Sequence, residues 1–120
     1  MPHTPIQPGT GNYYKDVIAA KKEITTASKE LKVHKIDLAC GAMQKAITLL
    51  MPYSNNRLQY QVPQAGGGQP KQGPAFTQAT TEGIRLCSDA SSELDFKMVE
   101  NAVRTLCNAM SLNLPYADNW

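Results

Sequence analysis

One stretch of the chain, residues 36–52, decides the fold; it reads IDLACGAMQKAITLLMP. Its apolar side chains recur every three or four residues, which is typical of one face of an α-helix: Ile36, Ala39, Met43, Ala46, Ile47 and Leu50. Pro52 ends the pattern, because the residue before a proline is driven out of the helical region. The stretch therefore predicts an amphipathic helix closed by Pro52.

A similar pattern precedes it, with apolar side chains on one face at Val17, Ala20, Ile24, Ala27 and Leu31. Asn12 is the expected N-cap, and Asp16 lies in the first turn, where a negative charge suits the helix dipole. The phase of the two faces changes at residues 32–35, which contain neither Gly nor Pro. Residues 12–52 therefore form either a tight helical hairpin or one long bent helix, and we favour the hairpin.

The other half repeats this arrangement. A third helix is marked by Phe76, Thr80, Ile84 and Cys87. Ser92 is the expected N-cap of a fourth helix, from about Glu93 to Ser111, whose apolar face is Phe96, Val99, Val103, Leu106, Cys107 and Met110. An offset of sixty residues aligns this face with that of residues 36–50. We expect two hairpins side by side.

The remaining segments contain few apolar residues. Residues 1–11 contain three prolines and two glycines and read as an extended arm. Residues 53–75 combine a polar part, in which residues 58–62 alternate as in a short strand, with the Gly/Pro/Gln-rich linker PQAGGGQPKQGP. The prediction is an all-α protein with an arm (1–11), a hairpin (12–52), a linker region (53–75) and a second hairpin with a tail (76–120). Tyr116 and Trp120 are expected to pack the tail back onto the bundle.

Composition excludes several classes of protein. The 120 residues suit one domain, and no apolar run or leader indicates a membrane span or a secretory signal. Three cysteines without a CxxC pair argue against a disulfide scaffold or a zinc site and favour a reducing cytoplasm. The formal net charge of +2 is too weak for duplex nucleic acid. Because most of the lysines lie in the first half of the chain, that half could still bind a small anionic ligand.

Catalytic and cofactor motifs are missing from the sequence. It has two histidines, His3 and His34, neither next to a nucleophile or a carboxylate partner. No HExxH, GxGxxG or GxxxxGK[ST] pattern occurs. We therefore expect no enzyme activity, no metal and no cofactor.

Aromatic and basic residues are grouped on the first helix. Tyr13 and Tyr14 begin it, and Lys21, Lys22 and Lys29 follow within about four turns. Tyrosine rings stack on nucleobases and lysines neutralise phosphates, so this group suits a small anionic nucleotide between the helices of neighbouring subunits. The alternative is that the tyrosines secure the start of the helix while the lysines only provide solubility.

The spacing of Asp37, Leu38, Gly41, Met43 and Pro52 resembles the second helix of the hairpin module of phage anti-CBASS sponge proteins, shared in part by anti-Thoeris sponges. The resemblance covers about 40 of the 120 residues. It implies a non-catalytic oligomer that sequesters a cyclic nucleotide immune signal, with Tyr14 and Lys29 in ligand-binding positions. The family's usual arginine in the aliphatic run is replaced by Ile47, with Lys45 nearby.

The sequence thus predicts a homo-oligomeric anti-defence sponge in the cytoplasm, that of the host cell if the protein is viral. Its ligand-binding residues are expected to be Tyr13, Tyr14, Lys22, Lys29 and Lys45. The alternative function is that of a helical structural or adaptor protein, such as a virion component or a partner-binding bundle. The Pro/Gly-rich arm and linker favour this alternative, because extended segments often reach neighbouring subunits.

Overall fold

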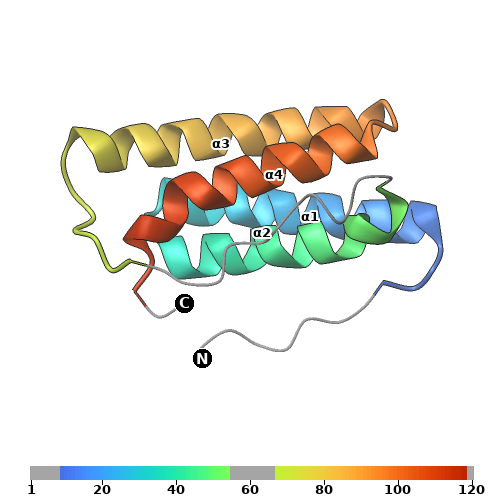
Figure 1. Ribbon diagram of the computed structural model, residues 1–120, viewed down its shortest axis with the longest axis horizontal. Coiled ribbons are helices and arrows are strands. Elements are labelled where there is room, and N and C mark those ends of the chain that lie inside the picture. The colour runs from blue at the N-terminus through green and yellow to red at the C-terminus, as the bar shows by residue number, and fades with distance from the viewer. Residues whose placement is uncertain (1–8, 55–66, 119–120) are drawn as a thin grey trace.

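The computed structural model describes residues 9–54 and 67–118, and within these ranges it contains helices and no strand (Figure 1). The four α-helices are α1 (Tyr13–Lys32), α2 (Ile36–Leu50), α3 (Pro74–Asp95) and α4 (Val99–Asn113). A short 3-10 helix follows each pair, η1 (Met51–Tyr53) and η3 (Leu114–Tyr116). The predicted all-α class with two hairpins is confirmed. The expected strand at 58–62, most of the arm and Trp120 lie outside the described residues.

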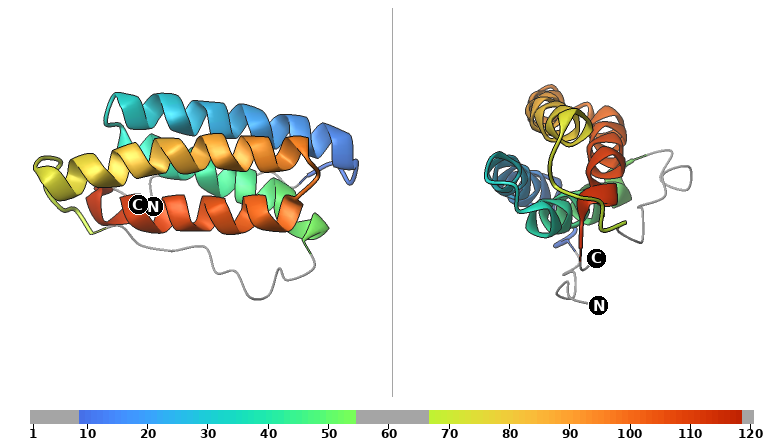
Figure 2. Two further views of the ribbon diagram at one scale, coloured as in Figure 1. Left: turned by 90° about the horizontal axis from the view of Figure 1, so that it is seen from above. Right: turned by 90° about the vertical axis from the view of Figure 1, so that its left-hand side faces the viewer.

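The two hairpins pack side by side, with α1 against α3 and α2 against α4 (Figure 2). Neighbouring helices are antiparallel, since Lys21 in the first half of α1 forms an ion pair with Asp95, the last residue of α3. Consequently α2 and α3 run in the same direction, and the chain between them passes from one end of the bundle to the other. Residues 67–69 secure the far end of this connection by donating backbone hydrogen bonds of 2.7–3.2 Å to carbonyls of residues 114–117. None of the described helices is both long and apolar enough to cross a bilayer.

One apolar core lies between the four helices. Each helix contributes one buried stripe, and alanines let the helices approach closely. The largest fully buried apolar side chains are Leu31, Ile36, Met43, Ile47, Leu50, Val103, Leu106 and Met110. The expected apolar faces of α1 and α2 therefore form the core, apart from Val17, which is half-buried.

Each hairpin closes through a tight turn without glycine. In the first turn His34 has φ of 61°, and the N–H groups of His34 and Lys35 donate to the carbonyls of Leu31 (3.1 Å) and Glu30 (2.9 Å). This is the Schellman pattern, whose left-handed position usually holds Gly. The favoured hairpin over residues 12–52 is confirmed, as is the N-cap, because Asn12 Oδ1 accepts from the Lys15 N–H at 3.1 Å.

The second turn has the same geometry, but it was predicted at the wrong place. Lys97 has φ of 59°, and α3 continues to Asp95, so Ser92 lies inside α3 and is not an N-cap. Phe96, expected in the core, lies in the turn and is 76% exposed. The physical reason is that buried Ala90 and Leu94 continue the apolar stripe of α3 past Cys87.

The two hairpins are equivalent at an offset of 63 residues, so the predicted offset of sixty is wrong. This offset superimposes α2 on α4, η1 on η3, and the turn at His34 on the turn at Lys97. It also aligns the segment ASKEL at 27–31 with ASSEL at 90–94, and Pro52-Tyr53 with Pro115-Tyr116. The chain is an internal duplication with an approximate two-fold axis between the hairpins.

Gly83 and Asn113 break this symmetry in the core. Their counterparts at the offset of 63 are Ala20 and Leu50, both fully buried. Asn113 Nδ2 donates to the carbonyl oxygens of Ala79 (3.1 Å) and Ala109 (3.0 Å). A Cβ at Gly83 would lie 2.6 Å from this Nδ2 and 2.9 Å from Leu31 Cδ1. The amide thus occupies the space that the glycine leaves.

We expect Gly83→Ala to destabilise the protein by about 1–3 kcal/mol, because the added methyl overpacks the site. Adding Asn113→Leu recreates the Ala20/Leu50 pairing of the first hairpin and should recover most of this loss. Urea unfolding of the two single variants and the double variant measures the coupling. Additive losses would show that the two positions do not share one packing site.

Candidate functional site: a lysine groove and a ring recess

Basic side chains line a continuous surface depression on α1. One recess of about 530 Å³ lies on the outer side of α1, and a second of about 460 Å³ lies along the seam between α1 and α3. They share Thr25 and Lys29, and together they form what we call the lysine groove, lined by Lys21, Lys22, Lys29 and Lys32 with several hydroxyl side chains. Among the described residues, no Asp or Glu lines either recess.

The charge of the groove distinguishes α1 from its duplicate α3. Lys22 corresponds to Arg85, which forms ion pairs with Glu82 and with Asp89, the latter at 2.8 Å. The same positions around Lys22 hold Ala19 and Thr26 instead of acids. Within the described part of the chain, Lys21 is the α1 lysine with an ion-pair partner, Asp95. The first hairpin therefore keeps positive charge that the second neutralises.

The predicted site residues fall into three places. Lys22 and Lys29 share the lysine groove. Tyr14 lies on the same side of α1 and is 64% exposed, with its ring centroid 5.4 Å from that of Tyr13. Tyr13 itself points into a different recess. Lys45 is half-buried on α2 and lines neither these recesses nor the one at Tyr13, so its role in binding stays a prediction.

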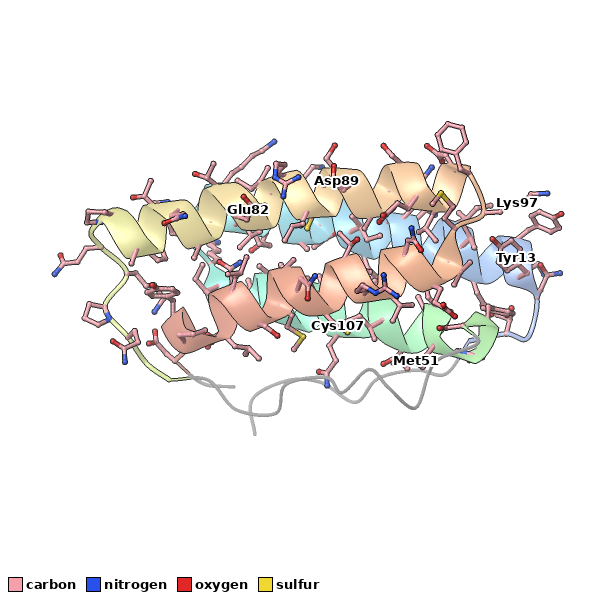
Figure 3. The ribbon with its side chains drawn as sticks, turned by 45° about the horizontal axis from the view of Figure 1, so that its top comes forward. Tyr13, Met51, Glu82, Asp89, Lys97 and Cys107 are labelled. Atoms are coloured by element: carbon pink, nitrogen blue, oxygen red, sulfur yellow. The ribbon has the colours of Figure 1, made fainter. Side chains whose placement is uncertain are left out.

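This other recess, the ring recess, lies where the start of α1 meets the turn between α3 and α4. It measures about 560 Å³ and is lined by Tyr13, Tyr53, Lys97, Met98, Val99, Glu100 and Asn101. Figure 3 shows Tyr13 and Lys97 at the same end of the bundle. The rings of Tyr13 and Tyr53 meet edge to face at 5.3 Å. Lys32, Tyr53, Lys97 and Asn101 were not among the predicted site residues. The repeat at an offset of 63 residues is the signal that pairs Lys97 with His34.

A buried carboxylate holds the wall of the ring recess in place. Asp16 is 1% exposed and accepts hydrogen bonds from the Thr10 N–H (2.9 Å), the Thr10 hydroxyl (3.0 Å) and the Tyr53 hydroxyl. These bonds, the Thr10 N–H foremost, lower the pKa of Asp16 below its usual 3.8. The bond to Asp16 and burial raise the pKa of Tyr53 from 10.0 to about 12. Asp16 thus ties η1, which follows α2, to the start of α1.

Two of the cysteines, Cys40 and Cys87, are buried among the apolar side chains of the core. Burial raises the pKa of Cys40 and of Cys87 to about 12, so both thiols stay protonated at neutral pH and pack as small apolar groups. No group of three or more His, Cys, Asp or Glu side chains in residues 9–54 and 67–118 could hold a metal ion. Lysines, hydroxyls and aromatic rings remain, and these bind ligands through charge, hydrogen bonds and stacking.

The contact between Asp16 and Tyr53 predicts how stability depends on pH. The lowered pKa of Asp16 means that its contribution is present above pH 3.8 and is lost as the pH falls through the folded-state value. The raised pKa of Tyr53 means that its contribution is present below pH 10.0 and is lost as the pH rises through about 12.

We expect Asp16→Asn to flatten the acid side of the curve of unfolding free energy against pH, and Tyr53→Phe to flatten the alkaline side. Urea titrations at a series of pH values measure both. Tyr14→Phe is the matched control, because its hydroxyl is not bonded to Asp16. An acid limb that is the same in Asp16→Asn and in the wild type would contradict this role of Asp16.

Comparison of the chain with protein-family models, with curated proteins and with solved structures finds no match.

Proposed function

We propose that the protein is a non-catalytic binding protein that sequesters a cyclic nucleotide signal of bacterial immunity, as a phage anti-defence sponge in the cytoplasm of the host. The observation that carries the proposal is the lysine groove: Lys22, Lys29 and Lys32 line it, and no acid among the described residues does. Phosphodiesters suit such a surface, because lysine ammonium groups bind phosphate as mobile point charges.

The spacing of the lysines supports a ligand with more than one phosphate. Lys22 and Lys29 are seven residues apart, which is about 10 Å along a helix, and Lys32 follows within one turn. A cyclic di- or trinucleotide presents its phosphates around one ring, so successive phosphates can meet successive lysines. Tyr14, seven residues before Lys21 and 64% exposed, offers a ring face on the same side of α1 for a base.

The groove's other side chains favour binding without chemical conversion. The hydroxyls of Thr25 and Thr26 donate to the carbonyls of Lys21 (3.0 Å) and Lys22 (3.1 Å), so they are engaged by the helix itself. Cys87, which lines the seam, is fully buried, and its raised pKa keeps it protonated. Among the described residues, the lining of this groove offers a ligand ammonium and hydroxyl groups but no carboxylate or imidazole.

Calorimetry against a panel of cyclic di- and trinucleotides tests the proposal. We expect at least one of them to bind, and the double variant Lys22→Ala/Lys29→Ala to weaken it at least about tenfold, because each charge-assisted contact contributes about 1.5–3 kcal/mol. Tyr14→Ala should weaken binding less, through lost stacking. The matched control is Lys15→Ala, which removes an exposed lysine of α1 outside the groove and should bind normally.

Two outcomes would contradict the proposal. Absence of binding across the panel would exclude the sponge function, and equal weakening by Lys15→Ala would show only a diffuse effect of charge. Chromatography of the ligand after incubation checks the non-catalytic part, since a sequestered nucleotide is recovered intact and a hydrolysed one is not.

The second candidate is a helical structural or adaptor protein. It is favoured by apolar side chains that stay exposed, namely Tyr14 (64%) and Ile18 (57%) on α1 and Phe96 (76%) in the turn between α3 and α4. The same residues also support the homo-oligomer that we propose for the sponge, since self-association would cover them. Native mass spectrometry separates the two candidates: a small homo-oligomer that retains nucleotide fits a sponge, and open assemblies without nucleotide fit a structural role.

A further inference from the structure

At the end of the bundle where α3 begins, ring side chains from both hairpins pack together into a cluster. The ring of Phe76 contacts Tyr116 at 5.2 Å and, from the turn of the other hairpin, His34 at 4.9 Å with an interplanar angle of 77°. With these neighbours Phe76 is only 2% exposed. The imidazole of His34 therefore helps to cover the aromatic ring at this end.

The opposite end repeats the cluster with two replacements. At the offset of 63 residues Tyr13 corresponds to Phe76, Tyr53 to Tyr116, and Lys97 to His34. The backbone of the turn is the same, since φ is 59° at Lys97 and 61° at His34. Lys97, however, carries a flexible aliphatic chain instead of a flat ring. Tyr13 stays half-exposed and lines the ring recess of about 560 Å³.

We propose that the ring recess is a binding site for a flat heteroaromatic ring such as a purine base, which packs against Tyr13 as His34 packs against Phe76. The volume lies within the range of small-molecule pockets. Asn101, at its edge, offers an amide with both a donor and an acceptor, the pair that reads the hydrogen-bonding edge of adenine.

This site is separate from the lysine groove, because the two share no lining residue. The inference therefore does not depend on the proposed sponge function. A base can enter the ring recess whether or not a phosphate binds to α1, and a neutral nucleoside without phosphate distinguishes the two sites.

NMR titration of the full-length protein with adenosine and with guanosine tests the inference. We expect at least one nucleoside to shift the amide signals of residues 97–101 in a saturable way, while those of residues 22–32 stay in place. Ribose alone is the control for the sugar and should cause no shift. The inference would be overturned if neither nucleoside shifted the amide signals of residues 97–101, or if the shifts were confined to residues of the lysine groove.

A pair of variants at Lys97 separates ring packing from a lysine contact. Lys97→His introduces the ring that closes the opposite end, so it should cover Tyr13 and weaken nucleoside binding at least about tenfold. Lys97→Gly keeps the recess open and suits the positive φ, so it should bind within about threefold of the wild type. Circular dichroism confirms that both variants are folded.

Undiminished binding by Lys97→His would overturn the inference, because the recess would then not be the site. Equal loss in Lys97→His and Lys97→Gly would overturn it as well, since the ammonium group and not the ring space would then hold the nucleoside.

Discussion

The structure depends on one constraint: neither hairpin can bury its apolar stripe alone. Two antiparallel helices cover each other along a single line of contact, and the stripes on α1 and α2 are wider than that line. The second hairpin supplies the missing cover, with α3 on α1 and α4 on α2. Because both hairpins descend from one pattern, the same contacts are made twice about an approximate two-fold axis. A core that contains many alanines then brings all four helices close together.

Duplication also explains why functional features lie where the two halves differ. Apart from Gly83 and Asn113, most positions that build the core stay apolar in both halves, as the matching segments at 27–31 and 90–94 show. Outside the core, Arg85 is neutralised by Glu82 and Asp89, whereas the equivalent positions around Lys22 hold Ala19 and Thr26. In the same way, His34 packs on one ring cluster, and Lys97 occupies the equivalent position beside the other. The symmetric frame therefore holds two asymmetric surfaces, the lysine groove and the ring recess.

Much of the fold could be predicted from apolar periodicity, since α1 and α2 have clear stripes and proline marks the end of α2. Both turns lack the glycine that usually marks a left-handed position; the change of phase at residues 32–35 still located the first turn, whereas the second was misplaced. Ser91 and Ser92 are of the residue type that favours an N-cap, and for this reason the second turn was predicted several residues before its position in the structure. Lys22 and Lys29 were singled out from their spacing on one helix, whereas Lys32, which also lines the groove, was not. Tyr53 and Lys97 were not singled out either, because folding brings them to Tyr13 from distant parts of the chain.

The crossing between α2 and α3 has a consequence for how such a chain can be connected. The end of the first hairpin and the start of the second lie at opposite poles of the bundle, and so do residues 118 and 9, by the same two-fold relation (Figure 1). A link from the last hairpin back to the first would have to span the same distance as the existing one. The packing of the helices therefore does not depend on which hairpin comes first in the chain. A circularly permuted gene that encodes residues 67–118 before residues 9–54 specifies the same packing.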